Sequence, residues 1–320
     1  MMKPILCNYY ITDRCNAHCA YCDIPTRQSQ PPATECSLED VETNLSQLKQ
    51  IGVRFIDFTG GEPLLHPQLP TMLQLARKRG FYTSVTTNCL LYHRRAKEIA
   101  GLVDLLHFSL DSMDPAENDQ LRGRHSFASV MLSLSIARSL GERPDLLYTV
   151  TPQNVSAIEK LARFAHRQRL MLIVNPVFRY HRQQPLSRSD IAYLDRFRDQ
   201  PFVYINRALH ELIRYGGNQR QFPRCRAVTA TIVISPRNEL LLPCYHHAQV
   251  LIPIKSHLAA ILHSREYEVM KKLQGTFPFC EGCTINCYFD PSFLYKLDRF
   301  WAWSLLSKLK YGFDKFCRRH

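Results

Sequence analysis

The sequence predicts an α/β fold, a partial (β/α)6 TIM-like barrel with a small C-terminal cysteine-rich extension. Three observations predict it. The first 180 residues alternate short β-rich runs with helical patterns, which is the order of a parallel sheet. Six such units can be counted, fewer than the eight of a closed barrel. Beyond them the alternation stops and cysteines return from Cys225 onward, which predicts the extension.

The six predicted strands are short runs of apolar and β-branched residues, at positions 5–12, 54–59, 82–87, 105–110, 146–151 and 171–174. Apolar residues at helical spacing predict the helices between them, at 38–50, 67–79, 94–100, 127–140 and 155–169. Ser37 suits the N-cap of the first helix, and Pro67 suits the first turn of the second. Two more helical patterns cover 187–198 and 203–215, and a hairpin is expected from strands at 230–234 and 239–242. We therefore expect a barrel over 1–215, the extension over 216–290 and a basic, aromatic, amphipathic helix over 291–320.

The composition is ordinary for a globular protein, with 45% hydrophobic and 22% charged residues. Twelve cysteines and no visible secretory signal indicate a cytoplasmic chain in which close-spaced cysteines bind metal more often than they pair. No apolar run reaches the roughly 18 residues that would span a membrane. The net charge of +13 gives no strong nucleic-acid signal, because no dense basic stripe with interleaved aromatics accompanies it.

Cys15, Cys19 and Cys22 form a C-x3-C-x2-C run directly after the first predicted strand. Three thiolates in one short loop can hold three irons of a [4Fe-4S] cluster and leave one iron open to a small chelating molecule. Zinc is the alternative, with His18 or Cys36 as the fourth ligand.

A glycine-rich turn, Gly60-Gly61-Glu62-Pro63, follows the second predicted strand. Together with the cysteine run it resembles the radical S-adenosylmethionine (SAM) superfamily. The resemblance implies that the three cysteines bind the cluster, that SAM chelates the open iron and that the turn binds the SAM amino group. Glycines let a backbone approach a ligand closely, and a glutamate can accept hydrogen bonds from an ammonium.

Further residues match positions that contact SAM in that family. Tyr21 matches the aromatic position beside the adenine, and Ser109 and Asp111 match the fourth-strand region that contacts the ribose or carboxylate. Asn88, at the end of the third predicted strand, completes a polar rim with them. The chain departs from the common Thr-Asn-Gly pattern at Cys89, which leaves the geometry of that turn open.

The extension carries five more cysteines with metal-ligand spacing, namely Cys225, Cys244, Cys280, Cys283 and Cys287. It resembles the SPASM and twitch extensions of radical SAM enzymes, which implies one auxiliary [4Fe-4S] cluster held by four of the five. The sequence does not say which thiol is spare, and four-thiolate zinc fits the spacing equally well.

The last helix places five apolar residues at helical spacing, Leu294, Leu297, Trp301, Leu305 and Leu309. This stripe predicts either packing on the barrel or contact with an anionic membrane surface, since the last 28 residues carry a charge of +5.

The resemblance implies a radical SAM enzyme that cleaves SAM to a 5′-deoxyadenosyl radical and abstracts hydrogen from a substrate. A peptide or protein substrate is expected from the SPASM-like extension, with a small molecule or lipid as the alternative. A flavodoxin or ferredoxin-type protein is the expected reductant. From a different class, a non-catalytic metal-binding or electron-transfer protein is disfavoured, because storing a cluster needs no SAM-binding turn.

Overall fold

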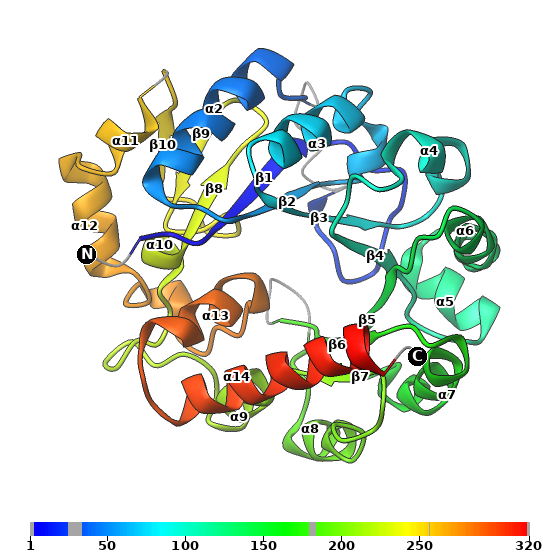
Figure 1. Cartoon of the computed structure of the whole chain (residues 1–320). Helices are drawn as coiled ribbons and strands as arrows, with labels where there is room; N and C mark the ends of the chain where they lie inside the picture. Colours follow the sequence, from blue (N-terminus) through cyan, green and yellow to red (C-terminus); the bar gives the residue numbers. More distant parts are fainter. Residues whose placement is uncertain (1–2, 25–33, 179–183, 256, 319–320) are drawn as a thin grey trace.

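A computed structural model describes residues 3–24, 34–178, 184–255 and 257–318. Its centre is one ten-stranded sheet in the order β10-β9-β8-β1-β2-β3-β4-β5-β6-β7 (Figure 1). The strands are β1 (Leu6–Thr12), β2 (Phe55–Gly60), β3 (Tyr82–Thr87), β4 (Leu105–Ser109), β5 (Asp145–Val150), β6 (Leu172–Pro176), β7 (Val203–Ile205), β8 (Thr231–Ile234), β9 (Glu239–Leu242) and β10 (Val250–Pro253). Strand β8 and strands β1 to β7 form a continuous parallel series, which confirms the predicted fold class.

Helices surround this curved sheet (Figure 1). They are α2 (Leu38–Ile51), α3 (Leu69–Lys78), α4 (Tyr92–Ile99), α5 (Pro115–Arg122), α6 (Phe127–Ser139), α7 (Ile158–Gln168), α8 (Arg188–Asp195), α9 (Arg207–Arg214), α10 (Ala227–Ala230), α11 (Leu258–Ile261), α12 (Arg265–Leu273), α13 (Asn286–Ser292) and α14 (Arg299–Gly312). The Ser37 side chain caps α2 by accepting from the Asp40 amide, and Gly52 ends the helix in the left-handed conformation. The predicted N-cap is thus confirmed.

Successive side chains of each strand point alternately to the outer helices, where the core lies, and to the barrel interior. On β2, Ile56 and Phe58 are fully buried against the outer helices, whereas Phe55 and Asp57 are accessible on the other face. Burying each large apolar side chain contributes about 1.5–3 kcal/mol, so the outward face fixes the strand's register. The inward face is left free for a site.

One expectation about secondary structure was wrong, and a second was confirmed but incomplete. Residues 203–215 do not form one helix, because Val203–Ile205 pairs with β6 as strand β7 and the Asn206 side chain then caps α9. The predicted hairpin does form as β8 and β9, but β8 also pairs in parallel with β1. The extension therefore continues the barrel sheet.

The C-terminal helix packs on the barrel, but only part of the predicted stripe takes part in the contact. Its contacts are with α9 and β7, and its buried side chains are Phe300, Ser304 and Ser307. Leu297 and Leu309 are 81% and 59% exposed. Just beyond α14, buried Lys315 donates to the buried Asp145 carboxylate at 2.7 Å, so polar contacts decide which face turns inward.

Candidate radical cluster and auxiliary cluster sites

The cysteine loop after β1 is held on one side by the turn after β2. The Gly61 amide donates to the Thr12 carbonyl at 2.9 Å, and the Glu62 amide donates to the Arg14 carbonyl at 2.8 Å. A Cβ on Gly61 would lie 2.1 Å from the Arg14 oxygen and 2.9 Å from the Cys15 Cβ. Gly60 and Gly61 therefore allow two segments of the chain to approach each other closely. The sequence had suggested that they allow approach to a ligand, and that role stays a prediction.

The other side of the loop is held by the end of α5, an element that the sequence did not predict. The His18 amide donates to the Arg122 carbonyl at 3.3 Å, and the Ala20 amide donates to the Leu121 carbonyl at 2.9 Å. A Cβ on Gly123 would lie 2.3 Å from the His18 oxygen. The loop that carries Cys15, Cys19 and Cys22 is thus clamped between two backbones.

Glu62 lies buried at the centre of this arrangement. Its carboxylate accepts hydrogen bonds from the Thr87 hydroxyl and the Asn88 amide, both at 2.8 Å, and from the Leu64 amide at 3.1 Å. Burial raises the pKa of Glu62, and these hydrogen bonds oppose the rise. Glu62 therefore fastens its own turn to β3, and its contact with the SAM ammonium stays a prediction.

Asn88 extends the connection to the cysteine loop, because its Nδ2 donates to Asn16 Oδ1 at 2.7 Å. Cys89 adopts a φ of 68°, so a cysteine occupies the left-handed position where related turns carry glycine. The turn that the sequence left open therefore has a left-handed residue at Cys89.

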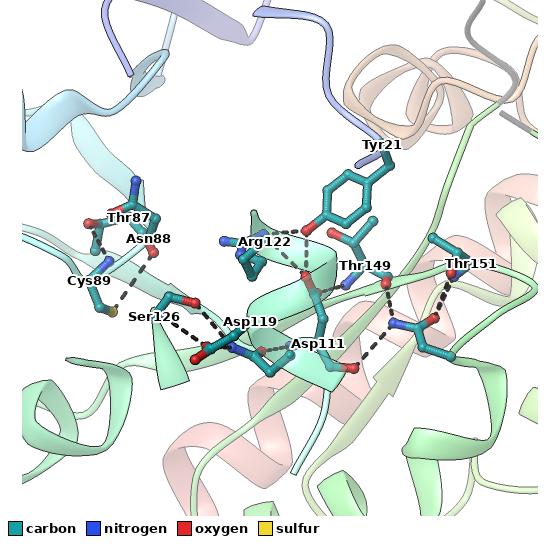
Figure 2. A network of polar contacts seen from close by, with 12 residues as sticks. Tyr21, Thr87, Asn88, Cys89, Asp111, Asp119, Arg122, Ser126, Thr149 and Thr151 are labelled. Carbon is teal, nitrogen blue, oxygen red and sulfur yellow. Dashed lines mark hydrogen bonds and ion pairs between the residues drawn. The ribbon is translucent and has the colours of Figure 1, made fainter. Parts of the chain in front are cut away.

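Tyr21 and Asp111 belong to one polar network (Figure 2). The Tyr21 hydroxyl donates to Asp111 Oδ2 at 2.5 Å, and Arg122 contacts both groups. Asp111 Oδ1 accepts from the Thr149 amide at 2.8 Å. Asp111 thus anchors the cysteine loop through Tyr21, and a direct contact of either residue with SAM stays a prediction. Ser109 is buried nearby on β4, and its side-chain hydroxyl makes no hydrogen bond to another described residue.

Sequence reasoning did not place Arg122 or Asp57 in the site. Arg122 is buried and its Nε has no hydrogen-bond partner within the described part of the chain, which suits an anionic group of a ligand. Asp57 faces the barrel interior, and its Oδ1 accepts from the Ser84 hydroxyl at 2.5 Å. Burial raises the pKa of Asp57 to about 6, which suits proton transfer near neutral pH.

Four of the five C-terminal cysteines line one cavity, namely Cys225, Cys244, Cys280 and Cys283. Burial raises the pKa of Cys225, and the neighbouring Cys283, Cys244 and Cys280 raise it further. Each thiolate disfavours the ionisation of its neighbours, so a nearby cationic centre is needed to stabilise all four as thiolates. The cavity therefore fits a metal centre with four sulfur ligands.

Cys287 does not line that cavity. Its side chain is exposed on α13 and lies near Asp57. The structure therefore supports Cys287 as the spare thiol that the sequence could not choose.

Asn218 organises the four-cysteine site, a role that no sequence motif predicted. Its side chain donates to the Cys280 carbonyl at 3.1 Å and accepts from the Cys225 amide at 3.2 Å, and its backbone amide donates to the Cys283 carbonyl at 2.9 Å. Next to it, a Cβ on Gly217 would lie 2.4 Å from the Gly282 oxygen. One buried asparagine thus positions three of the four ligands.

Neither cysteine group has the geometry of a single-ion site. Over the described ranges, no three His, Cys, Asp or Glu side chains converge as one metal ion requires. Zinc would need its thiolates at about 2.3 Å from a common point, whereas a four-iron cluster surrounds a wider core. The described side chains therefore form no preformed site for a single ion.

This fold, with a three-cysteine loop after β1 clamped by a Gly-Gly-Glu-Pro turn after β2, defines a class of enzyme that uses SAM and a [4Fe-4S] cluster. Residues 9–165 match the family model described as the Radical SAM superfamily. The chain belongs to this superfamily, as its motifs predicted.

Named relatives and a solved structure agree with this assignment. The chain is 38% identical to GTP 3′,8-cyclase of Chlorobaculum tepidum over 39% of its own length and 38% of the relative's. It is 26% identical to the antilisterial bacteriocin subtilosin biosynthesis protein AlbA of Bacillus subtilis over 88% of its length and 64% of that protein. It shares the fold of anSMEcpe with bound AdoMet and Cp18Cys peptide, at a TM-score of 0.65 and 16% identity, over 97% of both chains. The chain therefore spans less than half the length of the cyclase it matches.

Proposed function

We propose that this protein is a radical SAM enzyme that abstracts a hydrogen atom from an organic substrate. The observation that carries the proposal is the clamped cysteine loop, with its three thiols beside the Gly60–Pro63 turn. Bound at such a cluster, SAM is cleaved by one electron to methionine and a 5′-deoxyadenosyl radical. A flavodoxin or ferredoxin-type protein is the proposed electron donor.

The chain's own residues would orient SAM and the substrate. Arg122 offers an unpaired, buried N–H to the SAM carboxylate, and Glu62 keeps acceptor capacity for the ammonium. Ser109 offers a free hydroxyl at the end of β4. Asp57, inside the barrel, is the candidate acceptor for a proton released by the substrate.

The extension is proposed to hold one auxiliary [4Fe-4S] cluster through Cys225, Cys244, Cys280 and Cys283, because these four line one cavity. This second centre argues for an enzyme that moves electrons during turnover. A non-catalytic metal-binding or electron-transfer protein would not need the SAM-binding turn at Gly60–Pro63.

Two substrate classes are compatible with the site. A peptide or protein is supported by the likeness to AlbA and to the peptide-bound anSMEcpe structure. A small molecule or lipid is supported by an apolar chamber in the barrel and by the exposed apolar face of α14.

Changing Cys15, Cys19 and Cys22 together to alanine should abolish 5′-deoxyadenosine formation by anaerobically reconstituted, dithionite-reduced protein, because the cluster loses its ligands. Chromatographic detection of the nucleoside measures this. As a control, Cys317→Ala removes an exposed thiol outside both groups and should change nothing. Undiminished 5′-deoxyadenosine from the triple variant would refute the mechanism.

A membrane contact is proposed for the exposed stripe of the C-terminal segment, Leu306, Leu309, Phe313 and Phe316. These side chains are 53–65% exposed and recur at helical spacing, with basic residues nearby. No helix in the described ranges has the length and apolar character to cross a bilayer, so any contact would be at the surface. A cytoplasmic location, on the inner face of the membrane, is part of this proposal.

Vesicles rich in phosphatidylserine should capture the wild-type protein in flotation. The double substitution Leu306→Glu and Leu309→Glu should reduce capture at least about tenfold, because each leucine that enters the membrane contributes roughly 1.5–3 kcal/mol to binding. Leu132→Glu on α6, at an equally exposed leucine, is the matched control. Added salt should weaken capture by screening the basic charge. Equal capture of all three proteins would exclude the stripe as the contact.

A further inference from the structure

The barrel interior contains an apolar chamber at the N-terminal ends of the strands. We call it the floor chamber. Its volume is about 430 Å³, within the range of small-molecule sites. Strand residues Leu6, Phe55, Tyr82, Leu105 and Ile173 form much of its wall, and the segment from α13 to α14 closes it.

Strand register explains why the inner face of the sheet is layered at and beyond the chamber. Leu6, Phe55 and Tyr82 are neighbours across β1, β2 and β3 and form an apolar layer. Two residues further along each strand, Asn8, Asp57 and Ser84 form a polar layer on the same face. The polar layer lies nearer to the cysteine loop, because Asp57 is three residues, roughly 10 Å, before Gly60.

The apolar layer is not filled by protein. The Phe55 and Tyr82 rings stack at 5.4 Å between centroids, yet Phe55 is 37% and Tyr82 is 58% exposed. Closed barrels fill this space with bulky side chains. Large aromatic side chains left accessible inside a barrel indicate a space for an apolar ligand.

Several polar groups of the chamber wall are already engaged with protein partners, and the buried Nδ1 of His107 is an exception among the described residues. Ser84 donates to Asp57, Lys308 donates to Asp290 at 2.7 Å, and Tyr311 donates to Asp145 at 2.5 Å. The amide groups of a peptide would lose water on entering and would find few partners there. A hydrocarbon chain requires none.

We propose that the floor chamber binds the hydrocarbon chain of an amphiphilic substrate, an acyl or prenyl chain. The inference rests on the proposed function and selects the lipid-like class of substrate. The chain would lie against Phe55 and Tyr82, with the end that reacts directed past Asp57 toward the cysteine loop.

The test uses parinaric acid, a fluorescent long-chain fatty acid, titrated into the reconstituted enzyme. Wild type should bind it saturably, and Tyr82→Glu should weaken binding at least tenfold by placing a charge in the apolar layer. Because Tyr82 is largely accessible, this variant should fold, and its melting temperature checks that. Leu132→Glu is the control at a similarly exposed position outside the chamber and should bind as wild type does.

Three results would overturn the proposal. They are no saturable binding by wild type, unchanged affinity in folded Tyr82→Glu, or loss of binding in the Leu306→Glu and Leu309→Glu variant, which would place the probe on the outer stripe of α14. The variant lacking Cys15, Cys19 and Cys22 should still bind the probe. Failure of the chamber and failure of SAM cleavage are therefore separate results.

Discussion

Replacing Cys283 with serine should remove about four irons from the reconstituted protein, whereas replacing Cys287 with serine should remove none. Cys283 lines the cavity shared with Cys225, Cys244 and Cys280, and its backbone is fixed by Asn218. Cys287 lies only four residues later but faces away, toward Asp57. Iron and sulfide analysis of both variants, made in the background that lacks Cys15, Cys19 and Cys22, measures the second site alone.

Both substitutions exchange sulfur for oxygen in the same segment, so each controls for the other. If the Cys287 variant loses the iron and the Cys283 variant keeps it, the assignment of the spare thiol is wrong. If the background protein binds one zinc and no iron, the second centre is structural and the likeness to SPASM and twitch extensions does not extend to its metal.

The second large effect is expected for Gly61→Ala, which should lower the free energy of unfolding by about 3 kcal/mol and prevent cluster assembly. A Cβ at this position would meet the Arg14 carbonyl oxygen at 2.1 Å and the Cys15 Cβ at 2.9 Å. Neither neighbour is the flexible end of a side chain, so the cysteine loop itself must shift. Denaturant unfolding and iron content after reconstitution measure the two consequences.

Gly312→Ala is the matched control, because a Cβ there meets nothing within 4 Å and the position ends α14. It should leave the iron content unchanged and raise stability by up to about 1 kcal/mol through helix propensity. A Gly61→Ala protein that unfolds like wild type and binds full iron would show that the clamp between the turn and the cysteine loop is not required.

Much of the fold was predictable because the local signals agree with the tertiary arrangement. The predicted strand at 82–87 matches β3, and the predicted helix at 38–50 differs from α2 by one residue at its end. The helix predicted at 203–215 was wrong in its first residues because the three-residue strand β7 has too weak a local signal. Only the pairing of β7 with β6 reveals this strand. The same holds for β8, whose parallel neighbour β1 lies more than 200 residues away in sequence.

The candidate site likewise has features that the motifs predicted and features that only the structure revealed. The motif Gly60–Pro63 was correctly placed beside the cysteine loop, but its glycines turned out to serve backbone contacts with Thr12 and Arg14. Tyr21 and Asp111 contact each other, and the contact of each with SAM stays a prediction. Motif reasoning identifies which residues gather, whereas their hydrogen bonds depend on neighbours that no motif contains.

The sequence alone determined the α/β class, the two cysteine groups and the radical SAM superfamily, because cysteine spacing and strand-ending turns are local properties of the chain. Only the tertiary structure separated Cys287 from the four cysteines of the second cavity, showed which side chains of α14 are buried and left the floor chamber open. Each of these depends on which side chains meet across distant segments. Burial and hydrogen bonding decide that, and neither is encoded in any single stretch of residues.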